Sequence, residues 1–97
     1  MKDIKEIRED LKEIRYYYSR VSVFEEGEKV IGINDVYNKV ELYNSTIRRA
    51  RPMLYDIYIG LYVHCLTQQS LALDMGYTRE YIQQLNKEVL LFFQKTL

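Results

Sequence analysis

Apolar residues recur at helical spacing near the start of the chain. Between residues 3 and 18 they step by three and four positions, with charged residues between them. The apolar positions are Ile4, Ile7, Leu11, Ile14 and Tyr18. This a/d spacing predicts a helix that buries one stripe. Because the stripe covers only about two and a half heptads, we expect it to pack within its own domain. A contribution to dimerisation is the alternative.

The helical pattern stops over residues 22–34, where Gly27, Gly32 and several acidic residues interrupt it. We interpret this stretch as a loop between two helices. A short β-hairpin, in which residues 21–24 face residues 29–33, is the alternative.

A second helical stripe follows this loop. Asn34 and Asp35 offer an N-cap, and the next apolar residues step by four, three and four positions. They are Val36, Val40, Tyr43 and Ile47. We expect the helix to run to about Ala50, because the residue before Pro52 avoids the helical region. Its length suits antiparallel pairing with the first helix.

A third helix is predicted from Pro52, which suits a first helical turn, to near Cys65. Its buried face would hold Leu54, Ile57, Tyr58 and Leu61. Thr67 can then cap a short helix that buries residues of the stretch 71–75, and Gly76 stands where a helix end favours a positive φ.

Thr78 can cap the last helix, with Glu80 in its first turn. The inner face would hold Ile82, Leu85, Val89, Leu90 and Phe93. Two helices joined by a tight glycine turn describe a helix-turn-helix. The prediction is therefore an all-α fold with a helical hairpin over 1–50 and a helix-turn-helix region over 51–97, packed as one compact domain.

The stretch 71–90 resembles region 4 of sigma-70-type factors. The matching positions are Gly76, Thr78, Arg79, Glu80, Ile82, Gln84, Leu85 and Leu90. Residues 51–67 resemble the helix that precedes this motif. The layout is similar to that of small phage late-transcription regulators of the ArpU and RinA type, and over the N-terminal half that similarity is architectural only.

The resemblance implies that Arg79 and Glu80 contact promoter bases and backbone. The next exposed turns would present Gln83, Gln84 and Lys87. Chemistry agrees with this assignment, because Gln can pair with adenine, Arg with guanine and Glu with cytosine. We therefore expect the helix over 78–92 to read double-stranded DNA, with Thr78 at its start.

Two features depart from the family. Tyr81 and Gln83 stand where the family has Arg, and residues 67–97 hold three basic and three acidic side chains. Since phosphate contacts supply most non-specific affinity, one copy would bind DNA weakly. We therefore expect a homodimer, or a partner such as RNA polymerase or another transcription regulator. The apolar run Leu90–Phe93 could pack on a second subunit.

A positive patch lies at the junction of the second and third helices, with Lys39 earlier in the chain. It consists of Arg48, Arg49 and Arg51. We assign these arginines to phosphates that flank the groove. The alternative is a solvated helix end, where cations are favourable.

Composition narrows the class of protein. The chain has 97 residues, 14 Lys and Arg, 14 Asp and Glu, one His and one Cys. This allows one small domain, excludes an intramolecular disulfide and leaves no run long enough to cross a membrane. The charged N-terminus does not resemble a signal peptide, so we expect a cytoplasmic protein.

No arrangement of residues predicts catalysis. His64 and Cys65 lack the partner spacing of a zinc site, and we predict no metal, no cofactor and no enzyme. The tyrosines at 16–18 and at 55, 58 and 62 are interpreted mainly as packing residues. The sequence predicts a DNA-binding transcription regulator encoded by a phage or mobile element. The alternative is a protein-interaction module that binds a regulator or polymerase subunit without DNA contact.

Overall fold

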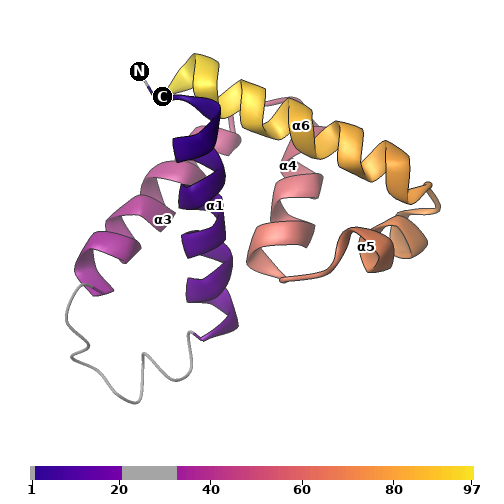
Figure 1. The fold of residues 1–97 in the computed structure, drawn as a ribbon, viewed down its shortest axis with the longest axis horizontal. Coiled ribbons are helices and arrows are strands. Elements are labelled where there is room, and N and C mark those ends of the chain that lie inside the picture. Colours follow the sequence, from indigo (N-terminus) through magenta and orange to yellow (C-terminus); the bar gives the residue numbers. More distant parts are fainter. Residues whose placement is uncertain (1, 21–32) are drawn as a thin grey trace.

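The computed structural model describes residues 2–20 and 33–97. Within these residues the chain forms five helices and no strand, as the periodicity predicts (Figure 1). The helices are α1 (Ile4–Ser19), α3 (Ile33–Ile47), α4 (Pro52–Tyr58) with its π-helical continuation η1 (Ile59–Val63), α5 (Gln68–Met75) and α6 (Arg79–Thr96). Most of the stretch 22–34, and with it the alternative hairpin, lies outside the described residues.

Helix α1 begins with a capping box. The Asp3 carboxylate accepts a hydrogen bond from the Glu6 backbone N–H at 2.8 Å, and the Asp3 N–H donates to Glu6 at 3.1 Å. The predicted stripe is confirmed, because Ile7, Leu11 and Ile14 are fully buried. The stripe is therefore used inside the chain and is not free to form a dimer.

Helix α3 differs from the prediction at both ends. The backbone is already helical at Ile33, so Asn34 and Asp35 lie in the first turn and not at the N-cap. The helix ends at Ile47, before Ala50, because the N–H groups of residues 49 and 50 bond to carbonyls three positions back. This tight turn leads into Arg51, whose extended backbone (φ −63°, ψ 151°) is what the following proline requires.

Helix α4 has Pro52 in its first turn, and its predicted face is buried in full. The sequence did not predict the π-helical turn that follows. There the His64 N–H donates to the Ile59 carbonyl at 2.8 Å, five residues back. Cys65 then adopts a left-handed backbone (φ 59°), which ends the element near the predicted position.

Helix α6 packs against α1, α3, α4 and α5, and its far end brings the C-terminus close to the N-terminus (Figure 1). Phe93 lies in the centre of the core, with ring centroids 4.6 Å from Tyr43 and 5.7 Å from Tyr58. Leu90 and Phe93 are buried in the chain's own core. The expectation that this run packs on a second subunit is therefore wrong for these two side chains, because the hairpin helices already cover them.

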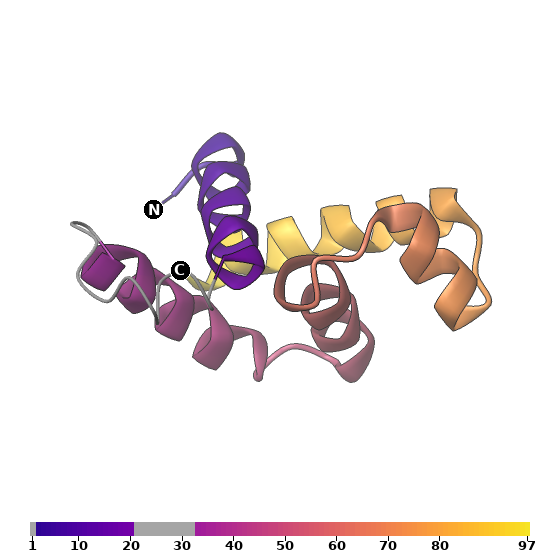
Figure 2. The same ribbon diagram turned by 90° about the horizontal axis from the view of Figure 1, so that it is seen from below.

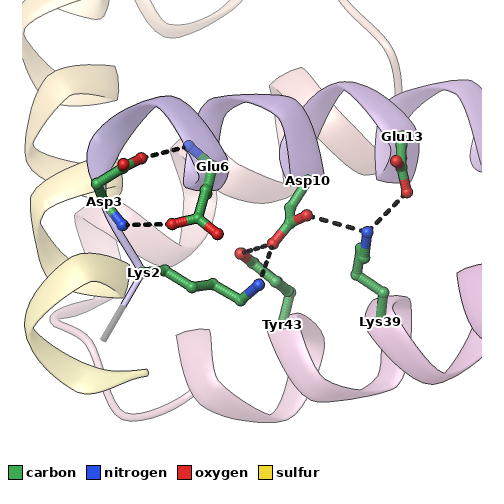
Figure 3. A network of polar contacts seen from close by, with 7 residues as sticks. All are labelled: Lys2, Asp3, Glu6, Asp10, Glu13, Lys39 and Tyr43. Carbon is green, nitrogen blue, oxygen red and sulfur yellow. Dashed lines mark hydrogen bonds and ion pairs between the residues drawn. The ribbon is translucent and has the colours of Figure 1, made fainter.

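Two polar junctions tie the helices together. Asp10 of α1 is buried and accepts a hydrogen bond from the Tyr43 hydroxyl at 2.6 Å, with Lys39 at 2.9 Å (Figure 3). Asn44 of α3 accepts a hydrogen bond from Tyr58 at 2.6 Å and donates one to Tyr18 at 2.8 Å. These contacts link α1, α3 and α4 through groups that would otherwise be costly to bury. Among the described residues, no helix is both long and apolar enough to span a bilayer.

Candidate nucleic-acid interface

The caps predicted around the turn between α5 and α6 are confirmed. The Thr67 hydroxyl accepts from the Ser70 N–H at 3.0 Å, and the Thr78 hydroxyl accepts from the Tyr81 N–H at 3.1 Å. Gly76 ends α5 in the left-handed region (φ 75°), and the next N–H donates to the Ala72 carbonyl at 2.9 Å. The Gly76 N–H donates to the same carbonyl, so the left-handed glycine cap satisfies the Ala72 carbonyl at the end of α5.

Along the longest axis of the molecule, the turn lies at the end opposite to both chain termini (Figure 1). Leu71 and Ala72 of α5 and Ile82 and Leu85 of α6 are buried there. Their burial leaves the opposite side of α6 toward solvent. The fold thus fixes the first turns of α6 by caps and by packing, without covering their outer surface.

All six predicted positions on α6 and its cap are exposed. They are Thr78, Arg79, Glu80, Gln83, Gln84 and Lys87. Glu80 in the first turn and Lys95 in the last complement the helix dipole. The side chains form one solvent-facing ridge along the first half of α6, which we call the α6 ridge. Its amide, guanidinium, ammonium and carboxylate groups are the types that hydrogen-bond to base edges.

Helix α5 is seated on η1 by a close approach at Gly60. A methyl group at this position would lie 2.7 Å from Leu71 Cδ1. On the other side of η1, the Tyr62 hydroxyl donates to Asn86 of α6 at 2.5 Å. Burial raises the pKa of Tyr62 to about 12. The hydroxyl is a hydrogen-bond donor that ties η1 to α6.

The three arginines predicted to contact phosphates differ in their surroundings. Arg51 reaches α6, where its guanidinium forms an ion pair with Glu88 at 2.7 Å. Glu88 lies one helical turn beyond Gln84, so Arg51 borders the α6 ridge but is neutralised there. Arg48 and Arg49 are exposed in the turn after α3, and neither contacts α6 through a hydrogen bond or ion pair between described residues.

Sequence reasoning missed the role of Arg15. Its Nε donates to the Leu61 carbonyl at 3.1 Å, and its Nη2 donates to the Cys65 carbonyl at 2.8 Å. The side chain thus caps the end of η1 from α1, across about fifty residues of sequence. No local pattern could have found this, since the π-helical turn that exposes these carbonyls was not predicted.

Exposed apolar groups border the α6 ridge. Tyr77 and Tyr81 form an edge-to-face pair with centroids 5.0 Å apart, and Leu73 on α5 is 75% exposed. The spacing of the two tyrosines, four residues apart, is a signal that the sequence did contain. Of the other tyrosines, Tyr58 is fully buried, which confirms its interpretation as a core residue.

His64 is exposed at the end of η1, and Cys65 forms weak contacts to backbone carbonyls. No group of three or more His, Cys, Asp or Glu side chains that could hold a metal ion occurs among residues 2–20 and 33–97. Comparison of the chain with models of protein families, with curated proteins and with solved structures found no match.

Proposed function

We propose that this chain is a sequence-specific DNA-binding regulator of transcription, and that α5 and α6 act as its helix-turn-helix. In this proposal α6 enters the major groove, where the α6 ridge reads base edges. Arg48 and Arg49 would contact flanking phosphates. The likeness of residues 71–90 to sigma region 4 supports a role at promoters, with RNA polymerase as a further partner and a phage or mobile element as the source.

The observation that carries the proposal is the exposure of the α6 ridge next to a capped glycine turn. Helix α6 is anchored on one side by Ile82 and Leu85, which are buried, while Arg79 and Gln83 remain exposed. A buried ridge would have contradicted DNA reading outright. The chemistry of the ridge suits hydrogen bonding to bases better than non-specific attraction, since its charges nearly balance.

The proposal is tested by selecting preferred sequences from a random duplex library and measuring binding by fluorescence anisotropy. The variant Arg79→Ala/Gln83→Ala should lose about 1–3 kcal/mol of discrimination per lost bidentate contact. The matched control Arg20→Ala/Asn38→Ala, at an exposed position directly after α1 and another on α3, should keep the preference. Failure to select any sequence, or equal discrimination by both variants, would refute the proposal.

Exposed apolar side chains favour a second candidate function, that of a protein-interaction module. Leu73, Tyr77 and Tyr81 lie beside the turn, and large exposed apolar groups commonly mark protein contacts. A transcription regulator or an RNA polymerase subunit would be the partner. This candidate expects purified RNA polymerase to bind the chain with no DNA present, and expects Leu73→Ser to weaken that binding while Leu91→Ser, also exposed, does not.

A further inference from the structure

The charged residues of α1 are sorted onto two sides of the helix. Successive residues of an α-helix point about 100° apart, so positions three and four apart share a side. Four cations fall within an arc of about 80° on this geometry: Lys5, Arg8, Lys12 and Arg15. Four acids fall within a separate arc of about 100°: Glu6, Glu9, Asp10 and Glu13. We call the first arc the basic side of α1.

The acidic side is turned toward α3. Lys39 of α3 contacts Asp10 at 2.9 Å and Glu13 at 2.8 Å, and Tyr43 donates to Asp10 (Figure 3). Glu6 is held in the capping box. Two of the four carboxylates of α1, those of Asp10 and Glu13, are therefore paired with Lys39 within the fold, and the basic side lies away from α3.

The basic side is turned toward η1 and the start of α5. Arg15 on this side donates to the carbonyls of Leu61 and Cys65. Beside it lies an open pocket of about 290 Å³, whose lining includes Arg15, Tyr62 and Thr67. In Figure 2, where the molecule is seen from below, α1 lies above the line of α6, and α3 and α4 lie below it.

Three cations on the basic side of α1 have no ion-pair partner among the described residues. Lys5, Arg8 and Lys12 are exposed, and none of them forms an ion pair within the part of the chain that the structure describes. Lys39 of α3, by contrast, forms ion pairs with Asp10 and Glu13 of α1. A row of exposed cations without an ion-pair partner among the described residues is a surface that attracts a polyanion.

The basic side and the α6 ridge flank the same residue, Tyr62. Arg8 and Arg15 are close enough to the Tyr62 hydroxyl to oppose the rise in its pKa that burial causes. From α6, Asn86 accepts the hydrogen bond of that hydroxyl. Asn86 lies directly before Lys87 and one turn after Gln83, at the edge of the α6 ridge.

We propose that the basic side of α1, through Lys5, Arg8 and Lys12, binds the phosphate backbone of the DNA duplex whose bases the α6 ridge reads. This inference rests on the proposed function. It adds phosphate contacts to those proposed for Arg48 and Arg49, since residues 67–97 carry three basic and three acidic side chains and attract little by themselves. Arg15 keeps its structural hydrogen bonds and is not needed as a ligand.

The test compares the salt dependence of DNA binding in two variants that each lose two positive charges. Arg8→Gln/Lys12→Gln removes cations from the basic side, and Arg20→Gln/Lys95→Gln removes exposed cations elsewhere. Each phosphate contact contributes about 0.9 to the slope of log Kobs against log salt. We expect the slope of the first variant to fall by about 1.8 per bound protomer, with sequence preference retained, and the slope of the second to stay at the wild-type value.

Other outcomes overturn the inference in distinguishable ways. Wild-type chain that selects and binds a sequence, together with an unchanged slope for Arg8→Gln/Lys12→Gln, would reject the basic side and leave the proposed function standing. Equal falls in both variants would also reject it, since net charge alone would then account for the effect. If the wild-type chain binds no DNA, both this inference and the proposed function are rejected. Circular dichroism melting confirms that each variant is folded before binding is measured.

Discussion

Gly60 of η1 and Leu71 of α5 are packed so closely that a Cβ atom on Gly60 would lie 2.7 Å from Leu71 Cδ1 and 3.0 Å from Cδ2. Both residues are buried. This contact is one of those that seat α5 against the π-helical turn. Helix α5 in turn packs against α6, which carries the α6 ridge.

Gly60→Ala should destabilise the fold. Overpacking against Leu71 should cost about 1–3 kcal/mol. The preference of a helix for alanine over glycine should offset roughly 1 kcal/mol of that cost. Urea unfolding measures the difference. In a Leu71→Ala background the clash disappears and only the helical preference remains, so the same substitution should become stabilising. An equal cost in both backgrounds would show that the Leu71 contact is not the cause.

Gly76 differs from Gly60 because its surroundings are open. No heavy atom would lie within 4 Å of an added Cβ, and the cost of a substitution arises from the left-handed backbone at φ 75°. Gly76→Ala should therefore cost about 1–2 kcal/mol, and Gly76→Asn less, since Asn adopts this conformation more readily. Thermal unfolding followed by circular dichroism ranks the two; a larger loss for Asn would contradict the argument.

Elements whose causes are local were predictable from the sequence. The buried stripe of α1, the caps at Thr67 and Thr78 and the left-handed Gly76 all follow from residues within one or two turns of each other. The exposure of the α6 ridge followed in the same way from the periodicity of α6. These features can be predicted without knowing which helix packs against the segment, provided that some helix does.

Features that depend on tertiary contact were not predictable. The π-helical turn is stabilised by Arg15, which donates hydrogen bonds to carbonyls about fifty residues away in sequence. No sequence pattern near Ile59 predicts this turn. The early end of α3 at Ile47 and the pairing of Arg51 with Glu88 likewise depend on how α4 meets α6. The prediction that the apolar run at Leu90 packs on a second subunit failed for Leu90 and Phe93. An apolar composition alone does not distinguish an internal core from a subunit interface.

The carboxylate of Asp10 makes stability depend on acid pH. Burial opposes its ionisation, but hydrogen bonds from Tyr43, Lys39 and Lys2 outweigh burial, and the pKa of Asp10 is lowered in the folded chain. The ionised form is thus favoured by folding. Its contribution is fully present above the unfolded pKa of about 3.9 and is lost as the pH falls through the lower folded value.

Asp10→Asn should lower the free energy of unfolding at pH 7 by about 1.5–3 kcal/mol, the usual range for hydrogen bonds to a charged group. The difference between wild type and variant should shrink as the pH falls below about 3.9. Chemical denaturation at a series of pH values measures it. A difference that stays constant from neutral to strongly acidic pH would show that the charge of Asp10 is not responsible.

If the chain binds DNA as proposed, the ion pair between Arg51 and Glu88 predicts a variant that binds DNA more tightly. Both side chains are partly exposed, 53% and 39%, so breaking the pair should cost no more than about 1 kcal/mol of stability. Glu88→Gln removes a negative charge beside the α6 ridge and frees the Arg51 guanidinium for a phosphate. We expect higher affinity and a salt slope steeper by about 0.9, measured by anisotropy. Glu41→Gln, on the exposed side of α3, makes the same change in net charge and should have a smaller effect. Equal gains from the two variants would show that Arg51 takes no part in binding.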